Sequence, residues 1–197
     1  FDNQPVGYDT ASLRTLRKRV GFVLQNPDRQ IIAPTVFQDV AFGPTNLGLT
    51  EQEVKKSVTR ALRHVGLEGF ERRPPHQISG GEKKRVAIAG VLAMDPDVLV
   101  LDEPTSGLDP SGSEDIMDLL DELNNDGKTI IISTHNVELV YPWADRAILM
   151  LEGKILEEDI PQKAFGNPEY VRRAHLSLPT LLELHRELQK RGFDLQG

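Results

Sequence analysis

The sequence predicts an α/β fold with a mostly parallel sheet, crossover helices and an inserted helical subdomain. Short apolar runs alternate with helix-like segments, as in chains whose strands are joined by helices. The runs VLVLD at 98–102 and KTIIIS at 128–133 are nearly continuously apolar, which is typical of strands buried on both faces of a sheet. A long and mostly helical stretch at 35–96 precedes them.

The segment before this stretch is expected to form a short basic helix and then the first strand. The helix lies around Ser12 to Lys18, and the strand is RVGFVLQ at 19–25. Because the helical stretch follows this strand and precedes the next, it is an insertion within the α/β core.

Two capping boxes mark helix starts in the inserted stretch. Thr50 with Glu53, and Ser79 with Glu82, have the spacing at which a hydroxyl caps the amide three residues on and a glutamate reaches back. The two helices are expected to end near His64 and Met94.

The C-terminal part is expected to contain a hairpin and a helical tail. AILMLEGKILEE at 147–158 predicts two strands that turn at Glu152-Gly153, and the pattern beyond Pro161 is helical. We therefore divide the chain into an α/β core at 1–34 and 97–160, a helical subdomain at 35–96 and a helical tail at 161–197.

Composition limits the classes of function. The 197 residues carry a net charge of −7, which argues against a nucleic-acid binder because such proteins have a basic excess. The absence of cysteine excludes a disulfide framework and a thiolate metal site. The longest apolar run, VAIAGVLAM at 86–94, is too short to span a membrane. These features favour a globular protein of the cytoplasm.

Two adjacent carboxylates directly follow the apolar run at 98–102. Ligands of open parallel sheets bind at the carboxyl ends of the strands, where Asp102 and Glu103 are expected. Such a pair suits nucleotide chemistry, since the first carboxylate helps to hold Mg²⁺ and the second polarises an attacking water. The alternative is a strand that simply ends in a polar turn. Asp109, followed by Pro110, likewise has a simpler role as a helix cap.

ISGGEKKR at 78–85 combines a helix start with features that a helix start does not need. Gly80 and Gly81 each cost about 0.5–1 kcal/mol relative to alanine in a helix. The cations at 83–85 lie near the positive end of the helix dipole, where each is unfavourable by roughly 0.3–1 kcal/mol when exposed. Glycines at a helix start let backbone N–H groups approach an anion closely. We therefore favour a bound anion, or an acidic neighbour, over capping alone.

These segments together carry a family resemblance. SGGEKKR, VLVLDEP, SGLDP at 106–110 and STH at 133–135 have the order and spacing found in the nucleotide-binding subunits of ATP-binding-cassette (ABC) transporters. FVLQNPD at 22–28 matches the Q-loop of that family. The chain resembles these subunits over nearly its whole length. NPDRQ, TVFQDVAFGPTNLGL and VAIAGVLAM further resemble the cobalt/nickel and energy-coupling-factor importers.

The resemblance implies a P-loop-NTPase-like fold and an ATPase that uses ATP and Mg²⁺. Asp102, at the end of the Walker B strand, and Gln25 of the Q-loop would then assist Mg²⁺. Glu103 would be the general base, and His135, the switch histidine, would contact the γ-phosphate. A lone histidine at a strand end is otherwise more often a plain surface or core residue.

The resemblance also implies a head-to-tail pair of ATPase subunits. Each nucleotide would lie between the phosphate loop of one subunit and the signature motif of the other, so that Ser79, Gly80 and Gly81 cap the partner's ATP. Asp109 would act across the dimer interface. The family usually has glutamine at the position of Glu82, and a carboxylate facing phosphate would repel it. We therefore expect Glu82 to turn back onto its own helix start.

A transmembrane partner is implied as well, with the chain peripheral on the cytoplasmic face of the cell membrane. The region from Gln25 to Gly43 resembles the groove that receives the coupling helix of that partner, with core packing as the alternative for apolar residues such as Val40 and Phe42. The tail carries a leucine stripe that either packs on its own domain or contacts the second ATPase subunit: Leu181, Leu184 and Leu188.

The family's phosphate-binding loop, G-x-x-x-x-G-K-[ST], is expected upstream of residue 1, because FDNQPVGYD looks like the middle of a protein. GKT at 127–129 is not that loop, since Glu122 replaces its first glycine and a strand follows. Phe1 and Tyr8 are poor candidates for the aromatic that stacks on adenine. We therefore expect this chain to be inactive alone and ATP hydrolysis to belong to the longer protein.

Two other functions are alternatives. A non-transport ATPase of the same superfamily, such as a DNA-repair or chromosome-organising protein, needs a long coiled-coil insertion, for which residues 43–78 leave no room. A non-catalytic interaction module is the second, and the retention of Glu103 and His135 argues against it. The cargo (cobalt, nickel or a vitamin) and the identity of the second subunit are open.

Overall fold

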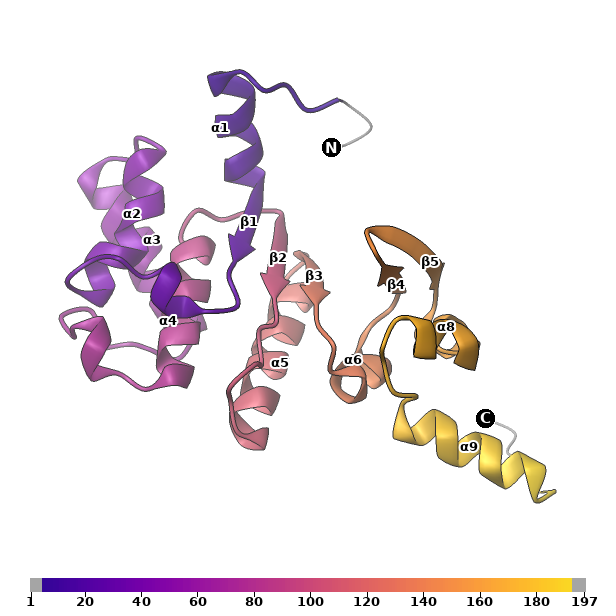
Figure 1. Ribbon diagram of the computed structural model, residues 1–197. Helices are drawn as coiled ribbons and strands as arrows, with labels where there is room; N and C mark the ends of the chain where they lie inside the picture. Colours follow the sequence, from indigo (N-terminus) through magenta and orange to yellow (C-terminus); the bar gives the residue numbers. More distant parts are fainter. Residues whose placement is uncertain (1–4, 193–197) are drawn as a thin grey trace. The chain divides into compact units, whose positions relative to one another are not determined.

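A computed structural model describes residues 5–192 of the chain, so Phe1 lies outside the described residues. The chain divides into two compact units, one ending at Ser133 and the other beginning at Thr134 (Figure 1). Among residues 5–192, no helix is both long enough and apolar enough to cross a membrane. The division of the chain at residues 34, 96 and 160 stays a prediction.

The first unit is built on a parallel sheet. Its strands are β1 (Val20–Val23), β2 (Val98–Asp102) and β3 (Thr129–Ser133), in the order β1-β2-β3. Val23 pairs with Leu101, and Asp102 pairs with Ser133, so the carboxyl ends of the strands meet at one edge. The predicted parallel α/β fold is therefore confirmed.

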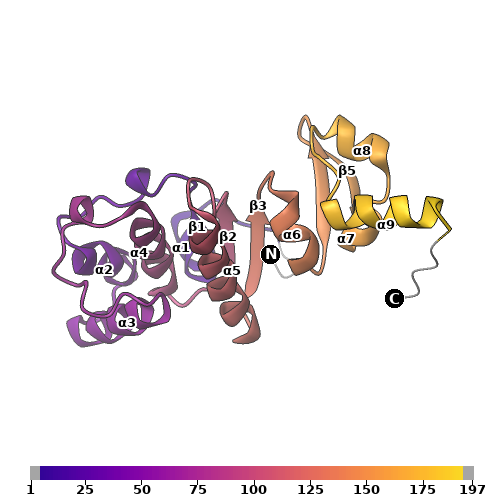
Figure 2. The same ribbon diagram turned by 90° about the horizontal axis from the view of Figure 1, so that it is seen from below.

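The two faces of this sheet are not equally covered. Helices α4 (Gly80–Leu92) and α5 (Pro110–Asn125) pack against the sheet (Figure 2). Leu99 and Leu101 are fully buried on one face of it. On the other face Phe22, Val100 and Ile131 stand side by side in register, and Phe22 and Ile131 are 53% and 50% exposed. The expectation of strands buried on both faces is wrong for the described residues, because only one face is covered by these helices.

The inserted stretch forms a small helical assembly beside the sheet. Helix α2 (Val36–Asn46) packs against α3 (Glu51–His64), and both pack against α4. Both predicted capping boxes are present, one at Thr50 and one at Ser79. Short segments complete the first unit: α1 (Thr10–Arg19), which contacts β1, and the 3₁₀ turns η1 (Pro27–Arg29) and η2 (Pro75–Gln77).

The GKT segment is a turn that enters a strand, as predicted. Gly127 has a φ of +90°, a conformation that favours glycine, and β3 begins at Thr129. Lys128 points back to the chain, where its Nζ donates to Asp95 Oδ1 at 3.0 Å and to the carbonyl of Pro96 at 2.8 Å. This lysine therefore has a structural role at the amino end of the sheet.

The second unit folds around the predicted hairpin of β4 (Ala147–Leu151) and β5 (Lys154–Asp159). Its core consists of Val137, Leu149, Phe165 and Val171. The surrounding helices are α6 (Val137–Trp143), α7 (Pro161–Ala164), α8 (Pro168–Arg173) and α9 (Thr180–Lys190).

The leucine stripe of the tail does not pack on this core as a unit. Leu182 packs against the core of the second unit, whereas Leu181 and Leu184 are 60% and 54% exposed. The alternative of packing on the chain's own domain is therefore wrong for Leu181 and Leu184, because α9 faces the core of the second unit with Leu182.

Candidate functional site

The predicted carboxylates lie at the carboxyl ends of β2 and β3. Asp102 is the last residue of β2, and its Oδ1 accepts a hydrogen bond from the hydroxyl of Ser133, the last residue of β3. The N–H of Glu103 donates to the carbonyl of Ser133 at 2.8 Å. The edge of the sheet therefore orients Asp102 and holds the backbone of Glu103.

Glu103 has a backbone conformation that residues other than glycine rarely adopt. Its φ is +44°, in the left-handed region, which in a non-glycine residue costs on the order of 1–3 kcal/mol unless its surroundings hold it. Its carbonyl accepts hydrogen bonds from the N–H of Ser106 at 3.1 Å and from Nζ of Lys84 at 3.2 Å. Both peptide groups of Glu103 are thus fixed by hydrogen bonds.

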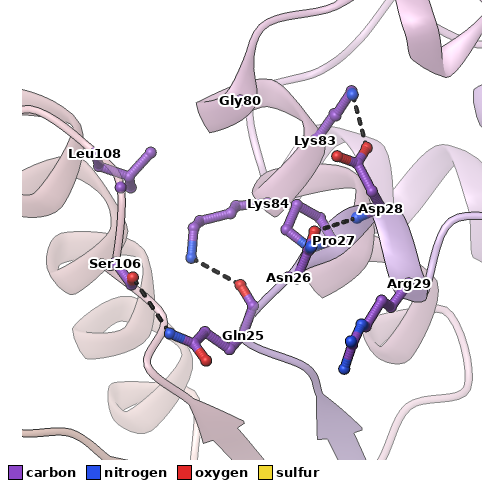
Figure 3. A pocket seen from close by; sticks show the side chains of 11 residues that line it. Gln25, Asn26, Pro27, Asp28, Arg29, Gly80, Lys83, Lys84, Ser106 and Leu108 are labelled. Atoms are coloured by element: carbon purple, nitrogen blue, oxygen red, sulfur yellow. Dashed lines mark hydrogen bonds and ion pairs between the residues drawn. The ribbon is translucent and has the colours of Figure 1, made fainter.

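Gln25 reaches the same region from the neighbouring strand β1. Its Nε2 lies 3.5 Å from Oγ of Ser106, and its carbonyl accepts a hydrogen bond from Lys84 Nζ at 3.3 Å. Gln25 and Glu103 therefore share Lys84 as a donor to their backbones, as Figure 3 shows for Gln25. This brings Gln25, the predicted Q-loop glutamine, and Glu103, the predicted general base, into one arrangement.

The predicted capping box is present at the start of α4. The Glu82 carboxylate accepts from the N–H of Ser79, so Glu82 has turned back onto its own helix start as expected. These hydrogen bonds, first from the backbone and then from the hydroxyl of Ser79, lower the pKa of Glu82. A Cβ at Gly80 would meet no atom within 4 Å, and one at Gly81 would make only ordinary contact with Leu108. Packing among residues 5–192 therefore does not require these glycines.

The three cations that follow find partners within the chain. Lys83 pairs with Asp28 at 2.7 Å, and Arg85 pairs with Asp115 at 3.0 Å and donates to the carbonyl of Val65. An acidic neighbour, the alternative to an anion, is therefore present for Lys83 and Arg85. Gly80 and Gly81 are therefore the features of this helix start that still indicate a bound anion.

A pocket of about 570 Å³ lies where the segment after β1, the start of α4 and the segment after β2 meet (Figure 3). It is lined by Gln25, Asn26, Pro27, Asp28, Arg29, Gly80, Lys83, Lys84, Ser106, Gly107 and Leu108. Gln25 and Gly80 are the predicted site residues among them. Sequence reasoning missed the roles of Lys84, Ser106 and Ser133, although each lies inside a motif that it had singled out.

Asp109 and His135 complete the set of predicted site residues. Asp109 is the N-cap of α5, and its Oδ1 accepts a hydrogen bond from the N–H of Gly112 at 2.9 Å, which confirms the capping alternative. His135 is an exposed residue of the second unit, and its place beside a nucleotide stays a prediction.

The oxygen donors at the strand ends suit Mg²⁺. The Asp102 carboxylate and the Gln25 amide offer hard oxygen ligands, and Mg²⁺ is usually held by one or two carboxylates together with substrate phosphates. In the part of the chain that the structure describes, no group of three or more His, Cys, Asp and Glu side chains could hold a metal.

Comparison with known proteins gives consistent results. A family model described as ABC transporter matches residues 1–106. The energy-coupling factor transporter ATP-binding protein EcfA2 of Methanospirillum hungatei is 66% identical over 98% of the chain, but the chain spans only 49% of that protein. The corresponding EcfA of Methanocaldococcus jannaschii is 57% identical over 95% of the chain and 67% of its own length.

Solved structures agree with these relatives. The cbiO1 protein of Clostridium perfringens, described as part of the ABC transporter complex cbiONQ, has a TM-score of 0.78 and 44% identity over 94% of the chain and 74% of its own. A dimeric ATP-binding cassette bound to ADP and Pi has a TM-score of 0.67 and 31% identity over 78% of the chain and 67% of its own.

Proposed function

The chain belongs to the ABC transporter family of ATP-binding proteins, and we propose that its full-length protein binds and hydrolyses ATP to power an importer. The names of its relatives support the energy-coupling-factor or cobalt/nickel class of importer. Because the chain spans about half of its EcfA2 relative, this activity is assigned to the full-length protein.

The observation that carries the proposal is that Gln25, Asp102 and Glu103 lie at the carboxyl ends of two neighbouring parallel strands, β1 and β2. Oxygen atoms of Asp102 and Gln25 would hold Mg²⁺, with Ser133 orienting the Asp102 carboxylate. When bound, Mg²⁺ neutralises charge on the β- and γ-phosphate oxygens. Ser106, which contacts Gln25 and the carbonyl of Glu103, ties the Q-loop to the strand ends.

Glu103 is the proposed general base. Its carboxylate takes a proton from water as the water oxygen bonds to the γ-phosphorus and the bond to the ADP oxygen breaks. The hydrogen bonds from Lys84 and Ser106 to its carbonyl, and from its own N–H to Ser133, hold the residue in its left-handed conformation. A base held in this way needs no rearrangement before it accepts the proton.

The start of α4 is the proposed contact with a nucleotide held by a second ATPase subunit. Gly80 and Gly81 each weaken the helix and have no packing reason within the chain, which supports close approach of a phosphate to their N–H groups. Ser79 would contribute beside them. Asp109 would act across the same head-to-tail interface, and His135 would contact the γ-phosphate.

The region from Gln25 to Gly43 is the proposed contact with a transmembrane subunit, which places the protein on the cytoplasmic face of the membrane. Ile32 and Phe42 are 71% and 56% exposed and suit such a contact. Val40 is fully buried, so its role is in the core. Cobalt, nickel and a vitamin are all compatible cargoes, because membrane and binding subunits select the cargo.

The test is Glu103→Gln in the full-length protein, with ATP binding and phosphate release both measured. We expect ATP to bind and hydrolysis to fall by about 100-fold or more, because general-base catalysis contributes on that scale. Glu114→Gln, an exposed residue of α5, is the control and should hydrolyse ATP normally. Undiminished hydrolysis by Glu103→Gln rejects Glu103 as the base, and failure of the unmodified protein to bind ATP rejects the function.

A further inference from the structure

We propose that Lys84 is a positioning residue for Glu103, whose backbone it joins to that of Gln25 across the start of α4. Its ammonium donates to the carbonyl of Glu103 at 3.2 Å and to the carbonyl of Gln25 at 3.3 Å. The inference rests on the proposed function, in which Glu103 accepts the proton of the attacking water.

The burial of Lys84 shows that its position is specific. The residue is only 7% exposed, although lysine is among the residues least often buried. Burial lowers the pKa of its ammonium, and the nearby Glu103 carboxylate acts in the opposite direction. A buried cation is tolerated where its N–H groups are hydrogen-bonded, and here the Lys84 ammonium donates to main-chain carbonyls of two predicted site residues.

The backbone of Glu103 needs such support. A non-glycine residue with a φ of +44° keeps that conformation only while its neighbours hold it. The Glu103 carbonyl accepts hydrogen bonds from Lys84 Nζ and from the N–H of Ser106, and the first of these donors is a side chain that can be replaced. Loss of the ammonium would therefore loosen the turn that begins at Glu103 and displace its carboxylate.

Lys84 also connects parts of the chain that are distant in sequence. It lies 59 residues from Gln25 and 19 residues from Glu103. Nearby, Lys83 forms an ion pair with Asp28, and Gln30 Nε2 donates to the carbonyl of Ala87 at 3.2 Å. The segment after β1 is therefore also bonded to α4 at these two points. Among these three donors, Lys84 is the one that also bonds to Glu103, so it is the residue to test.

The experiment compares Lys84→Met with Lys128→Met in the full-length protein. Lys128 is a matched control, because its Nζ also donates to a main-chain carbonyl, that of Pro96, but at the other end of the sheet. We expect Lys84→Met to lower kcat by about 10- to 100-fold, the scale of a misplaced catalytic group, with KM for ATP within about threefold. Lys128→Met should keep the normal kcat.

A second readout is independent of activity. Hydrogen–deuterium exchange at the Glu103 and Ser106 amides should be at least about tenfold faster in Lys84→Met, without nucleotide, and unchanged in Lys128→Met. Lys84→Gln keeps an N–H donor, and it should recover part of the lost kcat and slow the exchange again. If Lys84→Met does not fold, the kcat and the amide exchange of Lys84→Gln test the inference in its place.

The double variant Lys84→Met/Glu103→Gln separates a positioning role from a general structural role. If Lys84 acts through Glu103, the double variant should be no slower than Glu103→Gln alone. A further loss in the double variant, a normal kcat in Lys84→Met, or unchanged amide exchange at Glu103 overturns the inference. These results leave the proposed function standing when Glu103→Gln alone abolishes hydrolysis, whereas undiminished hydrolysis in that single variant rejects the proposed base itself.

Discussion

The carboxylate of Glu82 accepts a hydrogen bond from the N–H of Ser79 at 2.6 Å, and the hydroxyl of Ser79 accepts one from the N–H of Glu82 at 3.2 Å. This reciprocal pair closes the first turn of α4 and holds the Glu82 carboxylate on the backbone N–H of its own N-cap residue. Gly80 and Gly81 are not needed for it, which leaves their amides available to a phosphate.

The capping role of Glu82 predicts the order of stability of two variants. Glu82→Gln keeps an acceptor for the Ser79 amide and should remain close to the unmodified protein. Glu82→Ala removes it and should lower the free energy of unfolding by about 1 kcal/mol, as the loss of a cap does. Denaturant unfolding of the full-length proteins measures the difference, and equal stability of the alanine variant would contradict the capping role.

Asp95 predicts a pH dependence of stability. The hydrogen bond from Lys128 is the main cause that lowers the pKa of Asp95 below its ordinary 3.8, aided by the charges of Lys128, Arg60 and His64. Because the folded-state pKa is the lower one, the stabilisation is present above pH 3.8 and is lost as the pH falls through the folded pKa.

Asp95→Asn tests this dependence without straining the backbone, since asparagine tolerates the φ of +55° at this position. At pH 7 the variant should be less stable by at most about 1 kcal/mol, because the carboxylate is largely exposed. The difference should shrink as the pH falls below 3.8 and through the lower folded-state pKa of Asp95. In the Lys128→Met background the Asp95→Asn effect should shrink, and an effect of full size there would rule out Lys128 as the main cause.

Gly21 predicts a steric limit between β1 and α4. A Cβ at this position would lie 2.1 Å from Cγ1 of Val91, so Gly21→Ala should destabilise the protein by about 1–3 kcal/mol, as overpacking does. Gly90→Ala is the matched control, since its Cβ meets nothing within 4 Å and alanine should stabilise the helix by about 0.5–1 kcal/mol. Thermal melting reports both, and Val91→Ala should relieve the cost of Gly21→Ala if the clash is its cause.

Ser133 predicts a change in the Mg²⁺ requirement of hydrolysis. Its hydroxyl donates to the Asp102 carboxylate, so Ser133→Ala should raise the Mg²⁺ concentration for half-maximal hydrolysis by about 10-fold, the lower end for loss of a group that orients a metal ligand. Thr129→Ala, at the exposed start of the same strand, should leave this concentration unchanged. An equal shift in both variants would argue against Ser133 orienting the ligand.

Features that depend on near neighbours in the chain were predictable. The capping boxes at Thr50 and Ser79 place helix starts correctly because each box closes within four residues. The hairpin turns where Glu152 and Gly153 both have positive φ, as the sequence indicates. The strand ending at Asp102 follows from its apolar run, so the carboxylate edge of the sheet could also be foreseen.

Features that depend on distant contacts were not predictable. The cations at 83–85 suggested an anion, but Lys83 and Arg85 pair with acidic residues, and their sequence pattern does not reveal those partners. The apolar run of β2 suggested burial on both faces, yet a run of side chains does not show which face another element covers.

By itself the sequence determined the kinds of elements, their order and the motifs at the strand ends, because caps, turns and apolar periodicity act over a few residues. Only the tertiary structure decided that the Lys84 ammonium meets the carbonyls of Gln25 and Glu103. The physical reason is that packing of α4 beside the strand ends brings these atoms together, and main-chain carbonyls have no signature in a sequence.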